Sequence, residues 1–232
     1  MASPLQIAID GPAASGKTTV ARALSRRLHL LYLDTGAMYR ALAYLALQTR
    51  TDADNAAALR RLCQQGAIRV ELAAAAPLGF RIFAGDHELS EQILQSNEVT
   101  SLVSTVAAHP QVREAMVAQQ RAIAARGPIV MAGRDIGTVV LPDAPVKIFL
   151  TASVAARVER RRAQLAHVGQ AKDLSIHELE KEIVERDTLD RNRPVAPLVP
   201  ASDAHLIDSS EMSVDEVVEE IVEIVERTCS AA

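Results

Sequence analysis

The stretch Gly11-Pro-Ala-Ala-Ser-Gly16-Lys17-Thr18 matches the pattern G-x-x-x-x-G-K-[ST] at every defined position. An apolar run, Leu5–Asp10, comes directly before it, and a helical pattern follows it from about Lys17 to Leu28. A phosphate-binding loop needs this strand–loop–helix context, because its backbone N–H groups and the positive end of the helix both face the phosphate oxygens. The stretch therefore predicts a P-loop that binds a nucleoside triphosphate.

Each residue type in this loop has an expected task. The glycines let the backbone wrap closely around the phosphates, and Lys17 supplies a mobile cation for the β- and γ-phosphates. The hydroxyl of Thr18 is placed to bind Mg²⁺, so the expected cofactor is Mg²⁺ with ATP. The predicted ATP-binding residues of the loop are Gly11, Pro12, Ala13, Ala14, Ser15, Gly16, Lys17, Thr18 and Thr19.

Short apolar runs alternate with helical patterns along most of the chain, which is typical of an α/β protein with a parallel sheet. A parallel sheet is buried on both faces, so its strands appear as continuous apolar runs rather than alternating ones. The predicted core strands are Leu5–Asp10, Leu30–Leu33, Ile129–Ala132, Val146–Thr151 and His205–Asp208.

Two stretches interrupt this alternation. From about Gly66 to Leu94 the pattern becomes short and β-like, which predicts a small antiparallel sheet inserted in the core and followed by helices near Asn97–Ala108 and Pro110–Arg126. The polar loop Ala166–Asp173 lies between two Arg-rich helical patterns and is a lid candidate. We therefore expect a core of residues 1–65 and 127–232, a lid at about 157–193, and an insert sub-domain at 66–126.

The composition is that of an ordinary globular protein, with 49% hydrophobic and 23% charged residues among 232. We expect a cytoplasmic protein, because the chain has only two cysteines, no basic and apolar leader pattern, and no apolar window long enough for a membrane span. The sequence pI of about 5.9 argues against a general nucleic-acid binder, which should be basic. Arginine supplies 21 of the 25 basic residues, which points weakly to an anionic small substrate.

Absent motifs narrow the class of P-loop protein. The guanine-binding pattern [NT]KxD, the switch pattern DxxG and the ATP-cassette signature LSGGQ do not occur in the chain. A small-molecule kinase remains, and such an enzyme needs a second anion pocket that faces the loop. Four strings can supply it: Leu33–Arg40, Val112–Glu114, Gly133–Thr138 and Glu185–Arg193.

At these strings the chain closely resembles the bacterial cytidylate kinases, the (d)CMP kinase branch of the nucleoside-monophosphate kinases. LDTGAMYR (33–40), GRDIGTVV (133–140), DAPVKIFL (143–150) and DRNR (190–193) carry the resemblance, which covers essentially the whole chain. It implies a three-layer P-loop kinase fold with a five-stranded parallel sheet, a small β-rich monophosphate-binding insert and a lid. It also implies transfer of the ATP γ-phosphoryl group to CMP or dCMP, and we expect a monomer.

The resemblance assigns roles to individual residues. Arg40 and Arg134 resemble the family's clamp on the acceptor α-phosphate. Ser104, Arg113 and Asp135 fall where the family reads the cytosine base, and Thr35 matches a hydroxyl position near it. The implied substrate-binding residues are Thr35, Arg40, Ser104, Arg113, Arg134, Asp135, Arg186, Asp190 and Arg193.

Three further arginines look like the family's lid arginines, which close over the donor phosphates. Arg157, Arg160 and Arg161 have i, i+3 and i+4 spacing, which places them on one helix face. Arg162 lies off this face and is expected to be exposed. The implied catalytic residues are Lys17, Arg134, Arg157, Arg161, Arg186 and Arg193.

The sequence departs from the family pattern at three places, one of which is Thr18, where relatives often have Gly or Ser. Ala132 stands where several family members have an acid, which leaves open whether another acid handles the metal. Ala14 stands where relatives often have glycine. Two other functions also remain open from the residues themselves: a P-loop kinase for UMP/CMP, AMP or shikimate, and a non-enzymatic nucleotide-binding module.

Overall fold

The computed structural model of the protein describes residues 4–64, 66–167 and 175–230. The chain divides into two compact units: Met1–Leu33 together with Arg126–Ala232, called the P-loop unit below, and Asp34–Ala125, called the second unit. The predicted limits of the core (1–65 and 127–232), of the insert (66–126) and of the lid (about 157–193) stay predictions. Most of the predicted lid loop, Ala166–Asp173, lies outside the described residues.

The P-loop unit is built on a five-stranded sheet with the order β2-β6-β1-β7-β8. β1 is parallel to β6 and β7, and β7 is parallel to β8. The parallel α/β sheet is thus as predicted, and every predicted core strand is found within one residue at each end. The strands are β1 (Gln6–Asp10), β2 (Leu31–Asp34), β6 (Ile129–Gly133), β7 (Val146–Thr151) and β8 (His205–Asp208).

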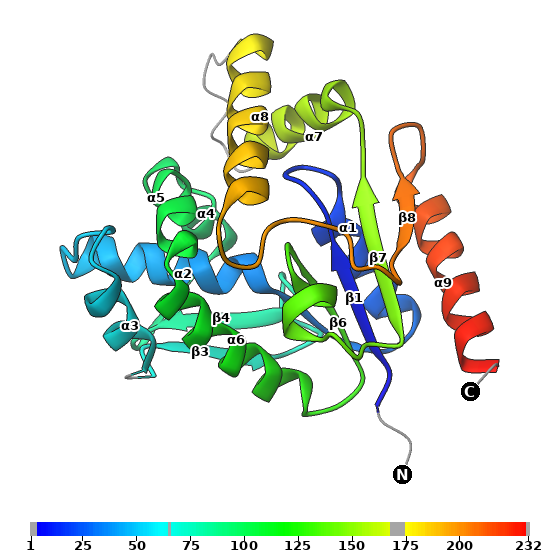
Figure 1. Cartoon of the computed structure of the whole chain (residues 1–232), viewed down its shortest axis with the longest axis horizontal. Coiled ribbons are helices and arrows are strands. Elements are labelled where there is room, and N and C mark those ends of the chain that lie inside the picture. Colours follow the sequence, from blue (N-terminus) through cyan, green and yellow to red (C-terminus); the bar gives the residue numbers. More distant parts are fainter. Residues whose placement is uncertain (1–3, 65, 168–174, 231–232) are drawn as a thin grey trace. The chain divides into compact units, whose positions relative to one another are not determined.

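Helices surround this sheet. α1 packs against β1, β6 and α9, and α9 also contacts β7. α7 and α8 pack against each other beyond the carboxyl end of β7 (Figure 1). Ser175 and Glu178 form a capping box at the start of α8. The helices are α1 (Lys17–Arg27), α7 (Val154–His167), α8 (Ile176–Asn192) and α9 (Val214–Ser230), and a π-helical turn, η1, covers Ile136–Val140.

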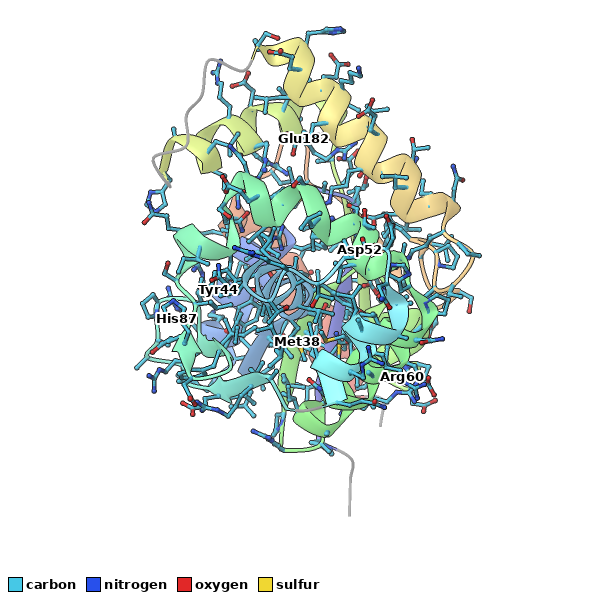
Figure 2. All side chains as sticks on the ribbon, turned by 90° about the vertical axis from the view of Figure 1, so that its left-hand side faces the viewer. Met38, Tyr44, Asp52, Arg60, His87 and Glu182 are labelled. Carbon is cyan, nitrogen blue, oxygen red and sulfur yellow. The ribbon has the colours of Figure 1, made fainter. Side chains whose placement is uncertain are left out.

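The second unit combines helices with an antiparallel sheet of order β3-β4-β5. The two-residue strand β5 was not predicted, because its exposed residues His87 and Glu88 carry no apolar pattern. The ring of His87 stacks on Tyr44 with centroids 5.9 Å apart, and Figure 2 labels both residues. The elements are α2 (Thr35–Gln48), α3 (Ala56–Gln64), β3 (Ile68–Leu72), β4 (Phe80–Ala84), β5 (His87–Glu88), α4 (Glu91–Leu94), α5 (Asn97–Ala108) and α6 (Pro110–Ala124).

The chain leaves β1 through a glycine that no other residue type fits. Gly11 has φ 152°, and a Cβ added there would lie 2.0 Å from the backbone oxygen of Leu150, at the end of β7. That oxygen belongs to a central strand and has little freedom to move. The P-loop therefore begins in close contact with the neighbouring strand.

Substitution of Gly11 by alanine tests this contact. We expect Gly11→Ala to lower the free energy of unfolding by at least about 3 kcal/mol, because positive φ and a backbone clash act together. Gly85→Ala is the matched control: φ there is 60°, and no described atom lies within 4 Å of the added Cβ. This variant should lose only about 1 kcal/mol. Denaturant unfolding of both variants measures the difference, and equal losses would contradict the close contact.

Candidate active site

The P-loop connects β1 to α1 as predicted. Gly16 precedes α1 with φ 95°, and Ala14 also has a positive φ, 56°. The Nζ atom of Lys17 donates to the backbone oxygen of Pro12 at 2.5 Å, so the ammonium group lies within the curve of the loop. Lys17 is buried, whereas Thr18 is exposed in the first turn of α1. The ammonium group of Lys17 and the hydroxyl of Thr18 therefore lie on adjacent residues at the start of α1.

Asp10, the last residue of β1, joins the P-loop to the segment after β6. Its Oδ1 accepts from the N–H of Ile136 at 2.8 Å and its Oδ2 from that of Gly137 at 2.7 Å. Burial raises the pKa of the Asp10 carboxyl to about 6, although the two N–H groups and Lys17 oppose the rise. Asp10 therefore holds the start of η1, directly after Arg134 and Asp135, in place.

Arg134 and Asp135 follow β6 at its carboxyl end and contact the C-terminal part of α8. The Nε of Arg134 donates to Asp190 Oδ2 at 2.7 Å. The guanidinium of Arg193 lies 3.6 Å from Asp135 and 3.9 Å from Asp190. Burial alone would raise the pKa of the Asp190 carboxyl, but Arg134, Arg186 and Arg193 together lower it below its ordinary value. The structure thus brings together five of the predicted substrate-binding residues in the P-loop unit.

The predicted lid arginines lie on α7, where Arg157 and Arg161 are buried and Arg160 is partly buried. Arg160 donates to the backbone oxygen of Ser15, at 3.2 Å, and to the Oγ and backbone oxygen of Ser209. Arg161 contacts Gln164 and Glu182, the latter labelled in Figure 2.

Arg157 reaches the P-loop at Ala13 and pairs with Asp187 on α8. Arg162 pairs with Glu159 at the surface, as expected for a residue off the face. The arginine face of α7 therefore contacts the P-loop and α8.

The remaining predicted substrate residues lie in the second unit. Thr35 is buried at the start of α2, and Ser104 lies half-buried on α5. The guanidinium of Arg113, on α6, donates to the backbone oxygen of Ala107 at 3.2 Å and lies 5.5 Å from the centre of the Tyr39 ring. Arg40 lies on α2 one turn after Gly36. The Nη1 atom of Arg40 is close to Gly36, because a Cβ added to that glycine would lie 3.1 Å from it. Within this unit, α2, α5 and α6 pack together and carry all four residues.

Comparison with known proteins decides the family. A model of the cytidylate kinase family matches residues 7–227 of the chain. The chain belongs to the cytidylate kinase family. Among curated relatives of this family, the cytidylate kinase of Geobacillus sp. (strain WCH70) is 50% identical over 225 residues, which are 97% of this chain and 98% of that protein. The cytidylate kinase of Pelotomaculum thermopropionicum is 50% identical over 216 residues, 93% of each chain.

A solved structure shares the fold with this family member. The crystal structure of an uncharacterised protein from Eubacterium ventriosum aligns with this chain with a TM-score of 0.52. The alignment covers 97% of this chain and 99% of that chain. The two sequences are 11% identical, so the likeness concerns the fold alone. In the part of the chain that the structure describes, no helix has the length and apolar character needed to cross a membrane.

Sequence reasoning missed three residues at the site of this family member. Asp10 appeared only as a strand end, and Asp187 stood unassigned beside Arg186. Ser209, just after β8, accepts from Arg160 on α7 and contacts the P-loop by donating to the Ser15 oxygen at 3.3 Å. The available signal was position: Asp10 ends β1 and Ser209 directly follows β8, and the carboxyl ends of these strands share one edge of the sheet.

The residues beside the loop fit a metal that is held mainly by nucleotide phosphates. Among the described residues, no group of three or more His, Cys, Asp or Glu could hold a metal ion. The buried carboxylate of Asp10 already accepts two backbone N–H groups, whereas the Thr18 side chain is exposed at the loop. One hydroxyl together with phosphate oxygens and waters suits Mg²⁺, which keeps several waters in such sites.

The raised pKa of Asp10 predicts a pH-dependent contribution to stability. Between about pH 4 and pH 6 the folded state holds a proton that the unfolded state has lost, so this group's contribution to the unfolding free energy falls as pH rises. The slope is at most about 1.4 kcal/mol per pH unit. We expect the stability difference between wild type and Asp10→Asn to decrease across this window in denaturant unfolding at several pH values. A difference that stays constant with pH would contradict the prediction.

Proposed function

We propose that this member of the cytidylate kinase family transfers the γ-phosphoryl group of ATP to CMP or dCMP, giving ADP and CDP or dCDP. The observation that carries the proposal is the placement of two anion-binding groups at adjacent strand ends. Lys17 lies in the loop after β1, and Arg134 lies after β6, its neighbour in the sheet. Open α/β sheets bind their ligands at this edge.

The proposed reaction asks for alignment and charge rather than covalent chemistry by the protein. The acceptor is already a phosphate anion, so no general base is needed. The barrier falls when cations hold two mutually repelling anions in line and stabilise the charge on the transferred group. The side chains proposed to supply those cations are Lys17, Arg134, Arg161, Arg186 and Arg193, with Arg157 and Arg160 acting beside the P-loop.

Mg²⁺ bound to ATP is part of this proposal, with Thr18 as the protein ligand. When bound, the ion supplies neutralisation of phosphate charge. The loop backbone and Lys17 orient the β- and γ-phosphates, and Thr19 stands beside Thr18 as a second exposed hydroxyl. We further propose that the enzyme is a cytoplasmic monomer.

The nucleobase is proposed to be read by Asp135, Arg113 and Ser104, with Thr35 near the base and Arg40 on the α-phosphate. Cytosine presents an N4 amine that donates, and N3 and O2 atoms that accept. An ionised Asp135 accepts from the amine, whereas Arg113 and Ser104 donate to N3 and O2. Asp190 is proposed to hold the sugar.

Replacement of Lys17 tests the donor side of the proposed function. We expect Lys17→Met to lower kcat about 10³-fold with CMP, because a charge-assisted contact to the phosphates is lost while the apolar stem is kept. Lys147→Met is the matched control, since Lys147 is equally buried but contacts Pro142 and Asp203. It should keep near wild-type activity.

A coupled ADP-release assay with CMP, UMP, AMP and shikimate measures both variants and the wild type. Wild-type turnover of CMP would rule out a non-enzymatic module. Wild-type preference for one of the other acceptors would contradict the proposed reaction. Retention of more than a tenth of wild-type kcat by Lys17→Met would contradict the role of the P-loop lysine.

Base choice tests the acceptor side. Uracil turns O4 towards the Asp135 carboxylate and N3–H towards the guanidinium, and each mismatch leaves a buried polar group unpaired. We expect at least about 10²-fold lower kcat/KM for UMP than for CMP. Asp135→Ala should reduce turnover of CMP strongly and of UMP little. Steady-state kinetics with both nucleotides measures this, and a CMP/UMP ratio that the substitution leaves unchanged would overturn the assignment.

A further inference from the structure

Both backbone groups of Ala13, in the middle of the P-loop, are bound by side chains from distant helices. The N–H of Ala13 donates to Asp187 Oδ1 on α8 at 3.1 Å. The backbone oxygen of Ala13 accepts from Nη1 of Arg157 on α7 at 3.2 Å. The peptide planes on the two sides of Ala13 are thus each held by a separate hydrogen bond.

The two side chains that hold Ala13 also bind each other. Nη1 of Arg157 lies 2.5 Å from Asp187 Oδ2, and Nε of Arg157 donates to the backbone oxygen of Ala152 at 3.1 Å. The exposed fractions of the Arg157 and Asp187 side chains are 5% and 6%. A buried ion pair often stabilises a fold no better than apolar residues would, so its presence calls for another reason. The backbone of Ala13 supplies that reason.

The next residue, Ala14, needs support from outside the loop. Its φ of 56° is costly for a residue with a Cβ, and such a conformation persists only where the surroundings enforce it. Ala14 packs against the apolar cluster between α7 and α8, which consists of Val158, Leu165, Leu179 and Ile183. The same two helices therefore hold Ala13 by hydrogen bonds and Ala14 by packing.

We propose that Asp187 is a positioning residue for the donor-phosphate loop. Together with Arg157 it fixes the peptide planes at Ala13, so the following N–H groups already point where the phosphates of ATP will bind. Arg157 then assists ATP binding through the loop backbone rather than by touching phosphate. Preorganisation of this kind strengthens binding because the loop loses less freedom when ATP arrives. The inference rests on the proposed kinase function only in naming ATP as the ligand.

The position of Asp187 on α8 gives the proposal a sharp expectation. Asp190, one turn further along, pairs with Arg134 on the proposed acceptor side. Asp187 contacts only the donor loop and its partner Arg157 among the contacts described. Loss of the Asp187 carboxylate should therefore weaken ATP binding and leave CMP binding almost unchanged. A merely structural role would affect both substrates or neither.

The first test compares Asp187→Asn with Glu185→Gln. Both remove one negative charge from α8, but Glu185 is exposed and faces Lys181. In Asp187→Asn the amide can still accept from Ala13, but its NH₂ group opposes Arg157. We expect the ATP dissociation constant by calorimetry and the KM for ATP to rise about tenfold, with the KM for CMP within about twofold of wild type. Glu185→Gln should match the wild type in all three.

A double-mutant cycle with Arg157→Gln separates a shared role from two separate ones. If Asp187 and Arg157 both act through Ala13, the ATP dissociation constant of the double variant should be about the same as that of the single variant that binds ATP less tightly. If the factor by which the double variant raises the ATP dissociation constant equals the product of the two single factors, the shared role is overturned. An unchanged ATP dissociation constant in folded Asp187→Asn would overturn the proposal while leaving the kinase function intact, whereas a wild type that does not phosphorylate CMP would overturn the function alone.

A measurement on the wild-type protein covers the case in which the variants fail to fold. The amide of Ala13 should exchange with solvent at least about 10²-fold more slowly than an unprotected amide, without nucleotide, because it donates to a buried carboxylate. Hydrogen exchange followed by NMR gives this rate. An Ala13 amide that exchanges at the rate of an exposed loop would overturn the proposal.

Discussion

A phosphate-binding loop directs some of its backbone groups towards the ligand, and the others still need hydrogen-bond partners on the side facing the protein. In this chain those partners are side chains from segments far along the sequence. Asp187 and Arg157 bind Ala13, while Arg160 and Ser209 bind the oxygen of Ser15. The arrangement of α7, α8 and the segment after β8 follows from this requirement, because α7 brings two polar groups to the loop and the other two segments bring one each.

The electrostatics of the P-loop unit follow the same logic. Its buried and partly buried guanidinium groups are paired with carboxylates: Arg134 contacts Asp190, Arg157 contacts Asp187, and Arg193 lies between Asp135 and Asp190. Pairing keeps several positive groups close together without the cost of an isolated buried charge. A family member that must gather two polyanionic nucleotides can therefore hold a preformed set of guanidinium groups, each fixed in orientation by a carboxylate.

The sequence was sufficient for the parts of the fold that depend on local pattern. Four of the core strands were predictable because each is mainly a short apolar run, whereas β8 has only Leu206 and Ile207 between two polar residues. The P-loop was predictable because its glycines and lysine have a fixed spacing. The face shared by Arg157 and Arg161 was predictable from helical periodicity, but their partners were not. Asp187 is 30 residues from Arg157, and no pattern links the two.

Other features of the fold and site could not be predicted from local sequence patterns, and some were predicted only from the resemblance to a family. β5 consists of two exposed residues and arises from pairing with β4. The division at Asp34 falls where β2 passes into α2, a junction that looks like any strand followed by a helix. The roles of Ser104 and Arg113 depended on resemblance, because a serine and an arginine on separate helices have no chemical signature of their own.

The spread of these contacts along the chain also bears on how the protein matures as it is synthesised. β1 pairs with β6 through Gln6 and Ile129, and the P-loop contacts reach 144, 174 and 194 residues along the chain. A ribosome that has released only the first half of the chain has therefore produced the phosphate-binding segment without the groups that hold it. Because non-local contacts of this kind form slowly, we expect the P-loop to be among the last parts of the molecule to gain all its partners, once β8 and Ser209 have been synthesised.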